Sequence, residues 1–413
     1  MINRKHLRAD PLALLAVALS APASAQFMNR AVYLGFEEEG FRRDFRQDRE
    51  YFVDRYAIID QPPWWRGTPE AFHPFQNRLS LAGGSVSSDE LSLESTVNLG
   101  VDVGRGVTVR ANYLASEHQT TRFTRFAVGM DFRTSESSSF FFQLEGDAGK
   151  DRADGSLGVE FLRSDHGAHR LMFTAVDWST GKSDVFEYDD KPYGVMLSGY
   201  RGRADGVRFL YDLGVQLPFQ ERLIGTGETF AMDRTIGLAE VRVPVSDEDE
   251  LVLGFDGELN SKELRQPDAV SILREDGDVQ RGRLRAEWWR RRDSGYDTSF
   301  GLWLHGIDED YVRPNDPAET RRVRRREAMF TGRVRVPFNP TWSVEPYVIA
   351  GHVDLTDRLG GQTGELDFEG FQGQAGIPIR YTFSDFALVR LDLSMLLDLF
   401  AFGGGAVQVE ARF

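Results

Sequence analysis

The chain has 413 residues, no cysteine and a formal net charge of −15, and it is rich in glycine (41) and phenylalanine (30). The absence of cysteine excludes a disulfide framework and thiolate metal sites. The acidic balance argues against nucleic-acid partners, because nucleic acids are bound by a basic face.

The N-terminus predicts export from the cytoplasm. MINRKHLR is basic, residues 11–19 form a short apolar run, and Ala-Ser-Ala at 23–25 is a small-residue cleavage site. These three features together are typical of a secretory signal peptide. We therefore expect residues 1–25 to be removed and the mature chain to start at Gln26. A disordered N-terminus is the alternative.

Residues 26–76 differ in pattern from the rest of the chain. Phe41, Phe45, Phe52 and Tyr56 recur near helical spacing among charged residues, which predicts one amphipathic helix. The stretch QPPWWRGTPEAFHPF follows, rich in proline and aromatic residues and without a clear period.

From about residue 77 onward, apolar and polar residues alternate with a period of two. Val107, Val109 and Tyr113, for example, alternate with Thr108 and Arg110. This pattern predicts strands with one apolar and one polar face. The same alternation recurs near 91–99, 126–132, 207–216, 251–258, 283–288 and 330–336.

Two features favour a membrane-spanning barrel over a soluble sandwich. The strand candidates are about 10 residues long, above the roughly 5–6 residues usual in soluble sheets. The connections also alternate between short turns and longer charged loops, as they do in transmembrane barrels. Short turns are expected near 101–106, 133–138, 165–169, 201–206, 245–249, 292–297, 337–341 and 380–385, and long loops near 179–191, 217–229, 260–281, 306–326 and 355–369.

We therefore expect residues 77–413 to form an all-β, transmembrane, antiparallel up-and-down β-barrel of about 18 strands (16–18). The mean hydropathy of −0.38 is compatible with this fold, because only alternate residues of such strands face lipid. Residues 26–76 are predicted to plug the lumen or to pack at its periplasmic mouth. A flexible periplasmic leader is the alternative.

The last strand, AVQVEARF, alternates and ends on the aromatic Phe413. With the export signal and the recurrent alternation, it resembles the Gram-negative outer-membrane β-barrels as a class, porin-like or polysaccharide-export-like in size and lumen polarity. No single family is matched. The resemblance implies location in the outer membrane, contact with its lipid and lipopolysaccharide, and recognition of Phe413 by the barrel-assembly machinery.

The residues between the apolar positions should face the lumen. So many charges require water there, because burying an unpaired ion is costly. We expect them to line a channel and to set its ion selectivity. The predicted lumen set is Arg110, Arg125, Arg208, Arg242, Arg283, Arg285, Arg333, Arg335, Arg390, Asp131, Glu145, Glu160, Asp256 and Glu258, joined by Glu94, Asp212, Glu240, Glu287, Glu345 and Asp392.

Two interpretations of these charges remain open. Arginines of the C-terminal third could face Asp131, Glu145 and Glu160 across the lumen and produce a transverse field. Alternatively, each charge is paired with an opposite charge on a neighbouring strand and holds the wall together.

Several aromatic residues have predicted positions in the wall. Trp288, Trp342, Phe140 and Phe142 fall on the outer face near strand ends, where interfacial aromatic girdles lie. Trp303 falls on the inner face, where it could stack on a sugar ring or on the plug.

No catalytic motif is found, since the sequence lacks a G-x-S-x-G elbow, an H-E-x-x-H pair and a P-loop. His166 and His169 have no third ligand nearby and are interpreted as solvated. The acidic runs 246–250 and 274–279 and the basic run 321–327 are interpreted as solvated turns and loops, with divalent cations or lipopolysaccharide phosphates as alternative ligands. We expect no enzyme activity, no cofactor and no metal.

The sequence thus predicts an outer-membrane channel with a wet, charged lumen. It would pass small hydrophilic solutes or export a polysaccharide. A structural or docking barrel that holds a periplasmic or surface partner is the alternative, and an outer-membrane enzyme is a weaker one.

Overall fold

The computed structural model describes residues 77–412, apart from 86–91, 119–120, 148–153, 165, 176–185, 204–205, 268–271, 293, 365–366 and 385–386. The predicted signal peptide, the helical segment within 26–76 and Phe413 lie outside these residues. Among the described residues, no helix is long and apolar enough to cross a membrane.

The described part of the chain consists of β-strands with one short 3-10 helix, η5 (Pro317–Glu319). The strands of the first half are β1 (Arg78–Ser85), β2 (Ser92–Gly104), β3 (Val107–His118), β4 (Thr121–Arg133), β5 (Ser139–Asp147), β6 (Asp154–Ser164), β7 (Gly167–Ala175), β8 (Phe186–Asp190), β9 (Tyr193–Arg201), β10 (Arg208–Leu223) and β11 (Thr229–Pro244). Those of the second half are β12 (Asp249–Pro267), β13 (Ile272–Arg290), β14 (Asp297–Val312), β15 (Arg321–Pro337), β16 (Trp342–Val344), β17 (Tyr347–Leu359), β18 (Gln362–Thr363), β19 (Phe368–Gly376), β20 (Ile379–Ser384), β21 (Ala387–Leu396) and β22 (Ala401–Arg412).

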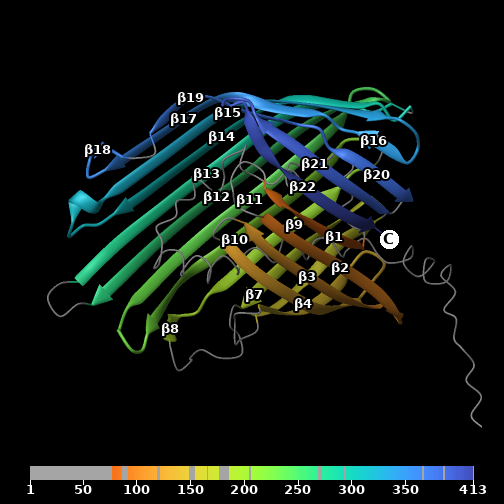
Figure 1. The fold of residues 1–413 in the computed structure, drawn as a ribbon. Helices are drawn as coiled ribbons and strands as arrows, with labels where there is room; N and C mark the ends of the chain where they lie inside the picture. Colours follow the sequence, from red (N-terminus) through yellow and green to blue (C-terminus); the bar gives the residue numbers. More distant parts are fainter. Residues whose placement is uncertain are drawn as a thin grey trace, which may run out of the picture.

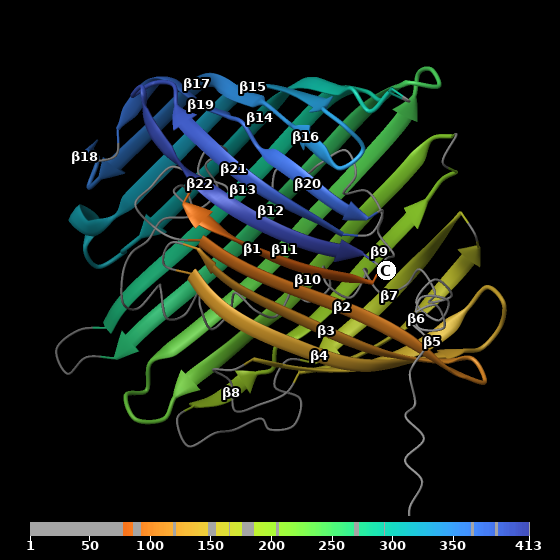
Figure 2. The same ribbon diagram turned by 45° about the vertical axis from the view of Figure 1, so that its right-hand side comes forward.

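These strands form one closed antiparallel sheet. β1 pairs with both β2 and β22, so the sheet has no free edge, and the ring is visible in Figures 1 and 2. Three barrel strands are interrupted, as β8–β9, β16–β17 and β18–β19–β20, and two of the breaks lie at Pro346 and Pro378, which have no backbone N–H to donate. The 22 segments therefore make 18 barrel strands, which confirms the predicted fold.

The eight connections predicted to be short do join consecutive strands at one end of the barrel. They span 105–106, 134–138, 165–166, 202–207, 245–248, 291–296, 338–341 and 385–386. β1 begins and β22 finishes at this same short-turn end, which is the periplasmic end in this class of barrel.

The long loops predicted at the opposite end are largely wrong. Residues 217–223, 260–267, 272–281 and 306–312 continue β10, β12, β13 and β14, and β12 and β13 each reach 19 residues. The run 274–279 therefore lies in β13, and the run 321–327 lies in β15. Both runs lie in strands that extend beyond the rest of the wall, as Figure 1 shows for β12 to β15.

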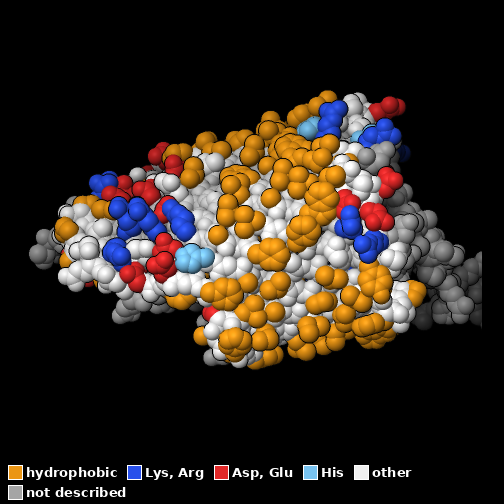
Figure 3. All heavy atoms as spheres, turned by 90° about the horizontal axis from the view of Figure 1, so that it is seen from above, with side chains coloured by type: hydrophobic (Ala, Val, Ile, Leu, Met, Phe, Trp, Pro, Cys, Tyr) orange, Lys and Arg blue, Asp and Glu red, His pale blue; other side chains and the backbone are white. Residues whose placement is uncertain are grey.

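The inside–outside assignment of the strands is confirmed at the height where the outer face is apolar. Val334 and Phe330 on β15 are 39% and 51% exposed, whereas Met329, the residue before Phe330, is fully buried. Leu253, Leu302 and Leu304 continue the exposed apolar surface on neighbouring strands. Figure 3 shows this apolar belt between charged zones at its two ends.

The predicted aromatic girdle lies near the short-turn end. Phe140, Phe142 and Trp342 are exposed on the outer face. Trp288 is half-buried, and its indole N–H donates a 2.9 Å hydrogen bond to Asp249 at the start of β12. An apolar ring with a polar contact at the strand end suits the membrane–water interface.

Beyond the belt, the inner face of the long strands is apolar and the outer face is charged, the reverse of the arrangement within the belt. The inner face carries an apolar cluster, and the outer face carries ion pairs such as Arg322–Asp310 and Arg326–Asp308. The run 321–327 contributes to both, because Val323 is buried inside and Arg324 is exposed outside. The inner cluster is Phe219, Phe230, Met232, Leu264, Val279, Ile307, Tyr311, Val323 and Leu355.

Candidate functional site

The candidate site is the inner wall of the barrel at the height of the apolar belt. Arg125 lies on β4 in register with the inner residues Ala127 and Asp131, but its side chain is outside the described part, as is that of Glu94. Every other residue of the predicted lumen set is buried or half-buried, in phase with the inner face of its strand. These are Arg110, Arg208, Arg242, Arg283, Arg285, Arg333, Arg335, Arg390, Asp131, Glu145, Glu160, Asp256 and Glu258, with Asp212, Glu240, Glu287, Glu345 and Asp392.

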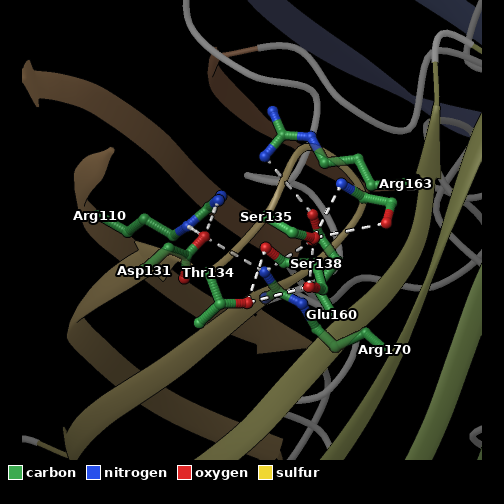
Figure 4. Close-up of polar contacts among 9 residues, drawn as sticks. Arg110, Asp131, Thr134, Ser135, Ser138, Glu160, Arg163 and Arg170 are labelled. Carbon is green, nitrogen blue, oxygen red and sulfur yellow. Dashed lines mark hydrogen bonds and ion pairs between the residues drawn. The ribbon is translucent and has the colours of Figure 1, made fainter. Parts of the chain in front are cut away.

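In the N-terminal wall, two arginines share two carboxylates (Figure 4). Arg110 on β3 donates a 2.7 Å hydrogen bond from Nε to Asp131 on β4. Arg170 on β7 reaches Asp131 at 3.4 Å and Glu160 at 3.2 Å. Its guanidinium also lies over the ring of Phe141, 4.1 Å from the centroid. The ion pairs of this network connect β3, β4, β6 and β7, and Phe141 adds a contact from β5.

Glu145 belongs to a second network on the same wall, which includes uncharged polar side chains. It accepts hydrogen bonds from Gln143 at 2.5 Å and from Ser156 at 3.0 Å. Ser156 lies 2.9 Å from the hydroxyl of Thr174 on the next strand. The polar groups of three adjacent strands are thus connected across the inner surface.

The central wall, β11 to β13, is a ladder of opposite charges. Arg234 donates a 2.8 Å hydrogen bond to Glu258 on β12. Arg281 and Arg283 of β13 donate to Asp256 at 2.8 and 2.7 Å. Asp256 and Arg283 are direct cross-strand neighbours, an arrangement that stabilises an antiparallel pair.

Two indoles meet at Glu287 on the inner face. The N–H groups of Trp289 and Trp303 donate hydrogen bonds of 2.7 and 2.5 Å to this carboxylate. Arg283 lies over the ring of Trp303, 5.4 Å from the centroid. That sugar rings stack on Trp303 stays a prediction.

Near the short-turn end, arginines gather on the inner face. Arg208 and Arg242 are direct cross-strand partners, and each contacts a carboxylate: Arg208 that of Glu250, and Arg242 that of Glu240 at 2.6 Å. Arg285 also pairs with Glu240. Further along the rim, Arg333, Arg335, Arg380 and Arg390 surround Glu345.

The described charges of the predicted set are therefore paired mainly with near neighbours. This is the arrangement that the pairing interpretation predicted, and it applies to Asp131 and Glu160 as well as to the C-terminal arginines. A role in ion selectivity stays a prediction. Sequence reasoning missed Arg170, Arg234, Arg281 and Arg380, which occupy inward positions of alternating strands. Extending the alternation through 167–175, 229–237, 272–282 and 379–384 could have found them.

The predicted histidine pair is divided between two places. His166 is exposed in the turn after β6, and His169 lies on β7 with its Nδ1 2.8 Å from the hydroxyl of Tyr211. Within the described part of the chain, no group of three or more side chains could hold a metal ion.

No protein-family model and no curated protein matches the sequence. Solved structures that resemble the fold include OmpTdeltaL8, a loop L8 deletion mutant of the outer membrane protein OmpT of Vibrio cholerae (10% identity, 82% of this chain and 97% of that chain, TM-score 0.41). Others are OccAB2 of Acinetobacter baumannii (8%, 82% and 97%, TM-score 0.37) and a structure titled bacterial polysaccharide outer membrane secretin (9%, 82% and 98%, TM-score 0.33). Likeness at this level says nothing about activity, substrate or partner.

The class of the protein follows from its own architecture. In lipid, every backbone donor and acceptor must be paired internally, and a sheet achieves this only when it closes. This sheet closes through β1 and β22 and presents an apolar belt outward. The chain is an outer-membrane β-barrel of the Gram-negative class.

Proposed function

We propose that the protein is a channel through which small hydrophilic solutes cross the outer membrane. The observation that carries the proposal is the inner wall at the height of the apolar belt, which is lined with ion-paired arginines and carboxylates. Such groups are stable beside water and costly beside lipid or a dry core. A closed barrel of 18 strands is also wider than its own side chains can fill, as in porins.

The wall opposite the charged ladder is also polar on its inner face. Between the ion pairs of Arg110 and Arg170, this face includes short side chains, all of them buried. The arginines described on the inner face are paired with carboxylates. The described inner face therefore lacks the continuous positive lining that an anionic polysaccharide would need along its whole path. The short residues are Ser80, Ala82, Asn98, Asn112, Ser156, Thr174, Ser198 and Ala406.

The test is single-channel conductance of the refolded mature protein, residues 26–413, in a planar bilayer. We expect steady, ion-selective conductance. A heat-modifiable, folded barrel that stays silent would overturn the proposal and favour a docking barrel. Titration with neutral sugars then separates small-solute passage, which leaves conductance unblocked, from polysaccharide binding, which blocks it.

A pair of variants on β12 tests whether the paired charges face the conducting path. Asp256→Asn removes one inward negative charge and should shift the reversal potential toward anions. Phe255→Leu, the adjacent outward residue, should leave the reversal potential unchanged. Equal reversal potentials in both variants would mean that ions do not pass along this wall.

A further inference from the structure

We propose that the arginine cluster around Glu345, near the short-turn end of the lumen, is a binding site for oxyanions, namely a carboxylate or phosphate group carried by a small solute. The cluster consists of Glu345, Arg333, Arg335, Arg380 and Arg390. The inference rests on the proposed function, because it names the class of solute that the channel would select.

The fold concentrates these arginines around one carboxylate. Glu345 precedes Pro346 at the break between β16 and β17, and its backbone N–H donates to Pro378 at the break between β19 and β20. It therefore lies between β15 and β20, with its side chain 2% exposed. Arg333 contacts it directly, and Arg380, Arg390 and Arg335 approach it at 3.5, 3.8 and 4.0 Å.

The strand register adds a repulsion to this cluster. Arg380 and Arg390 are direct cross-strand partners on β20 and β21, and like charges in that position destabilise a sheet. Two further carboxylates lie at the edge of the cluster, Asp392 at 3.8 Å from Arg390 and Asp297 at 3.5 Å from Arg335. The cluster thus has four guanidinium groups and three carboxylates, so an added anion would meet a net positive charge and would relieve the repulsion between Arg380 and Arg390.

A second rung of facing arginines shows what a compensated arrangement looks like. Arg208 and Arg242 also face each other directly, but each has a carboxylate in close contact, Glu250 and Glu240, which Arg291 and Arg285 also approach. Arg242 is further covered by the ring of Trp289, 4.5 Å from the guanidinium. At Glu345, four guanidinium groups converge on one carboxylate, and the two other carboxylates, Asp392 and Asp297, lie at the edge of the cluster.

The chemistry of the cluster favours an oxyanion over a halide. Guanidinium groups present parallel N–H donors whose spacing matches the oxygens of carboxylate and phosphate. The Nε of Arg390 is buried and makes no hydrogen bond within the described structure, so it is a donor that a bound oxygen could satisfy. A chloride ion has no second atom with which to use such a fork.

The experiment measures binding directly. Mature protein, residues 26–413, is refolded in detergent micelles and titrated calorimetrically with inorganic phosphate and, separately, with succinate, at constant ionic strength in chloride. We expect saturable binding of at least one of the two, and the tighter one identifies the group that the site prefers. No saturable binding of either would overturn the proposal.

Three variants locate the site. Arg390→Gln should weaken oxyanion binding about tenfold or more, because it removes a charge-assisted donor. Glu345→Gln should tighten binding, because it removes the competing carboxylate while the arginines remain. Arg324→Gln removes the same charge from the outer face and should leave binding unchanged. Equal affinities in wild type and Arg390→Gln, or weaker binding in Glu345→Gln, would contradict the proposal.

The remaining outcomes are distinguished by folding and by conductance. Heat-modifiability shows whether each variant is folded, and Arg380→Gln, with the same expected loss, replaces Arg390→Gln if that variant fails to fold. A barrel that binds phosphate or succinate at this site but conducts no ions would support the oxyanion site and overturn the channel proposal. A barrel that conducts ions but binds neither anion would support the channel and overturn the oxyanion site.

Discussion

The two halves of β15 follow one alternation but differ in chemistry. In the half near the short-turn end, Val334 and Phe330 point outward and Arg333 points inward. In the far half, Arg324 and Arg326 point outward and Val323 points inward, fully buried. The phase of the strand is unchanged, so the difference lies in what each face meets. Lipid meets the outer face of the first half, and water meets that of the second.

The row of residues where the exchange occurs marks the edge of the lipid belt. Leu284, Leu304 and Ala328 are aligned across β13, β14 and β15, and all three are exposed on the outer face. The next outward row contains Gly306 and Arg326, and ion pairs with Asp308 follow. We infer that the far interface of the membrane lies between these two rows on this wall.

The largest loss of stability is expected on the inner face of the far half of β15. Val323→Asp would place a carboxylate without a partner in the buried apolar cluster formed with Ile307 and Leu355. A buried charge without a partner costs about 3–5 kcal/mol. Urea unfolding followed by tryptophan fluorescence should show this loss, whereas Arg324→Ala, one residue away on the outer face, should shift the midpoint little. Similar losses of stability in Val323→Asp and Arg324→Ala would mean that the inner and outer faces of this half do not differ in burial.

A somewhat smaller effect is expected at the lipid belt. Val334→Arg would place a cation against lipid and should cost about 2 kcal/mol, within the range for lipid-facing positions below the midplane. The measurement is the folded fraction after refolding into vesicles. Arg333→Ala, the adjacent inward residue, should assemble normally and alter ion selectivity. If the two variants exchange phenotypes, the inside–outside assignment of β15 is wrong.

The same comparison explains how much of the fold was predictable from the sequence. Alternation identified the strands and the eight short turns, because in the belt one face is apolar without interruption. It failed for 260–267 and 306–312, where outward residues such as Glu263 and Asp308 are charged and the segment resembles a loop. A strand that leaves the membrane loses the lipid signal on which the prediction depended.

The candidate site was predictable only as a list of residues. The sequence identified Arg333, Arg390 and Glu345 as inward, because alternation fixes the face of each residue. It did not show that Arg380 lies directly opposite Arg390, since this contact is set by the pairing of β20 with β21. Which charges meet is a property of strand pairing, which a single sequence does not specify.

A small loss of stability is expected when the ion pairs on the outer face of the far half of β15 are removed. Asp308 lies 2.6 Å from Arg326 and 3.3 Å from Arg324, and all three side chains are about one-third to one-half exposed. Exposed pairs of this kind contribute about 0.2–1 kcal/mol and are screened by salt. Asp308→Asn should therefore lower the urea midpoint slightly in low salt, and the difference should vanish near 1 M salt, where the Debye length is about 3 Å. A difference that persists would indicate a contact other than charge.

The smallest effect is a pH dependence at the end of the barrel opposite the short turns. Asp367, between β18 and β19, accepts hydrogen bonds from the backbone N–H of Asp357 and from Arg358 at 2.7 and 2.9 Å. The backbone N–H of Asp357, and then Arg358, hold the pKa of the Asp367 carboxyl below its ordinary value of 3.8. The folded state therefore binds this proton less readily than the unfolded chain does. The contact contributes its full stability above pH 3.8 and loses it as the pH falls through the lowered pKa. Asp367→Asn should melt slightly earlier than wild type at neutral pH, and the two melting temperatures should converge in acid. If wild type instead gained stability over Asp367→Asn as the pH fell, protonation would stabilise the fold. The carboxylate would then oppose the fold of this loop.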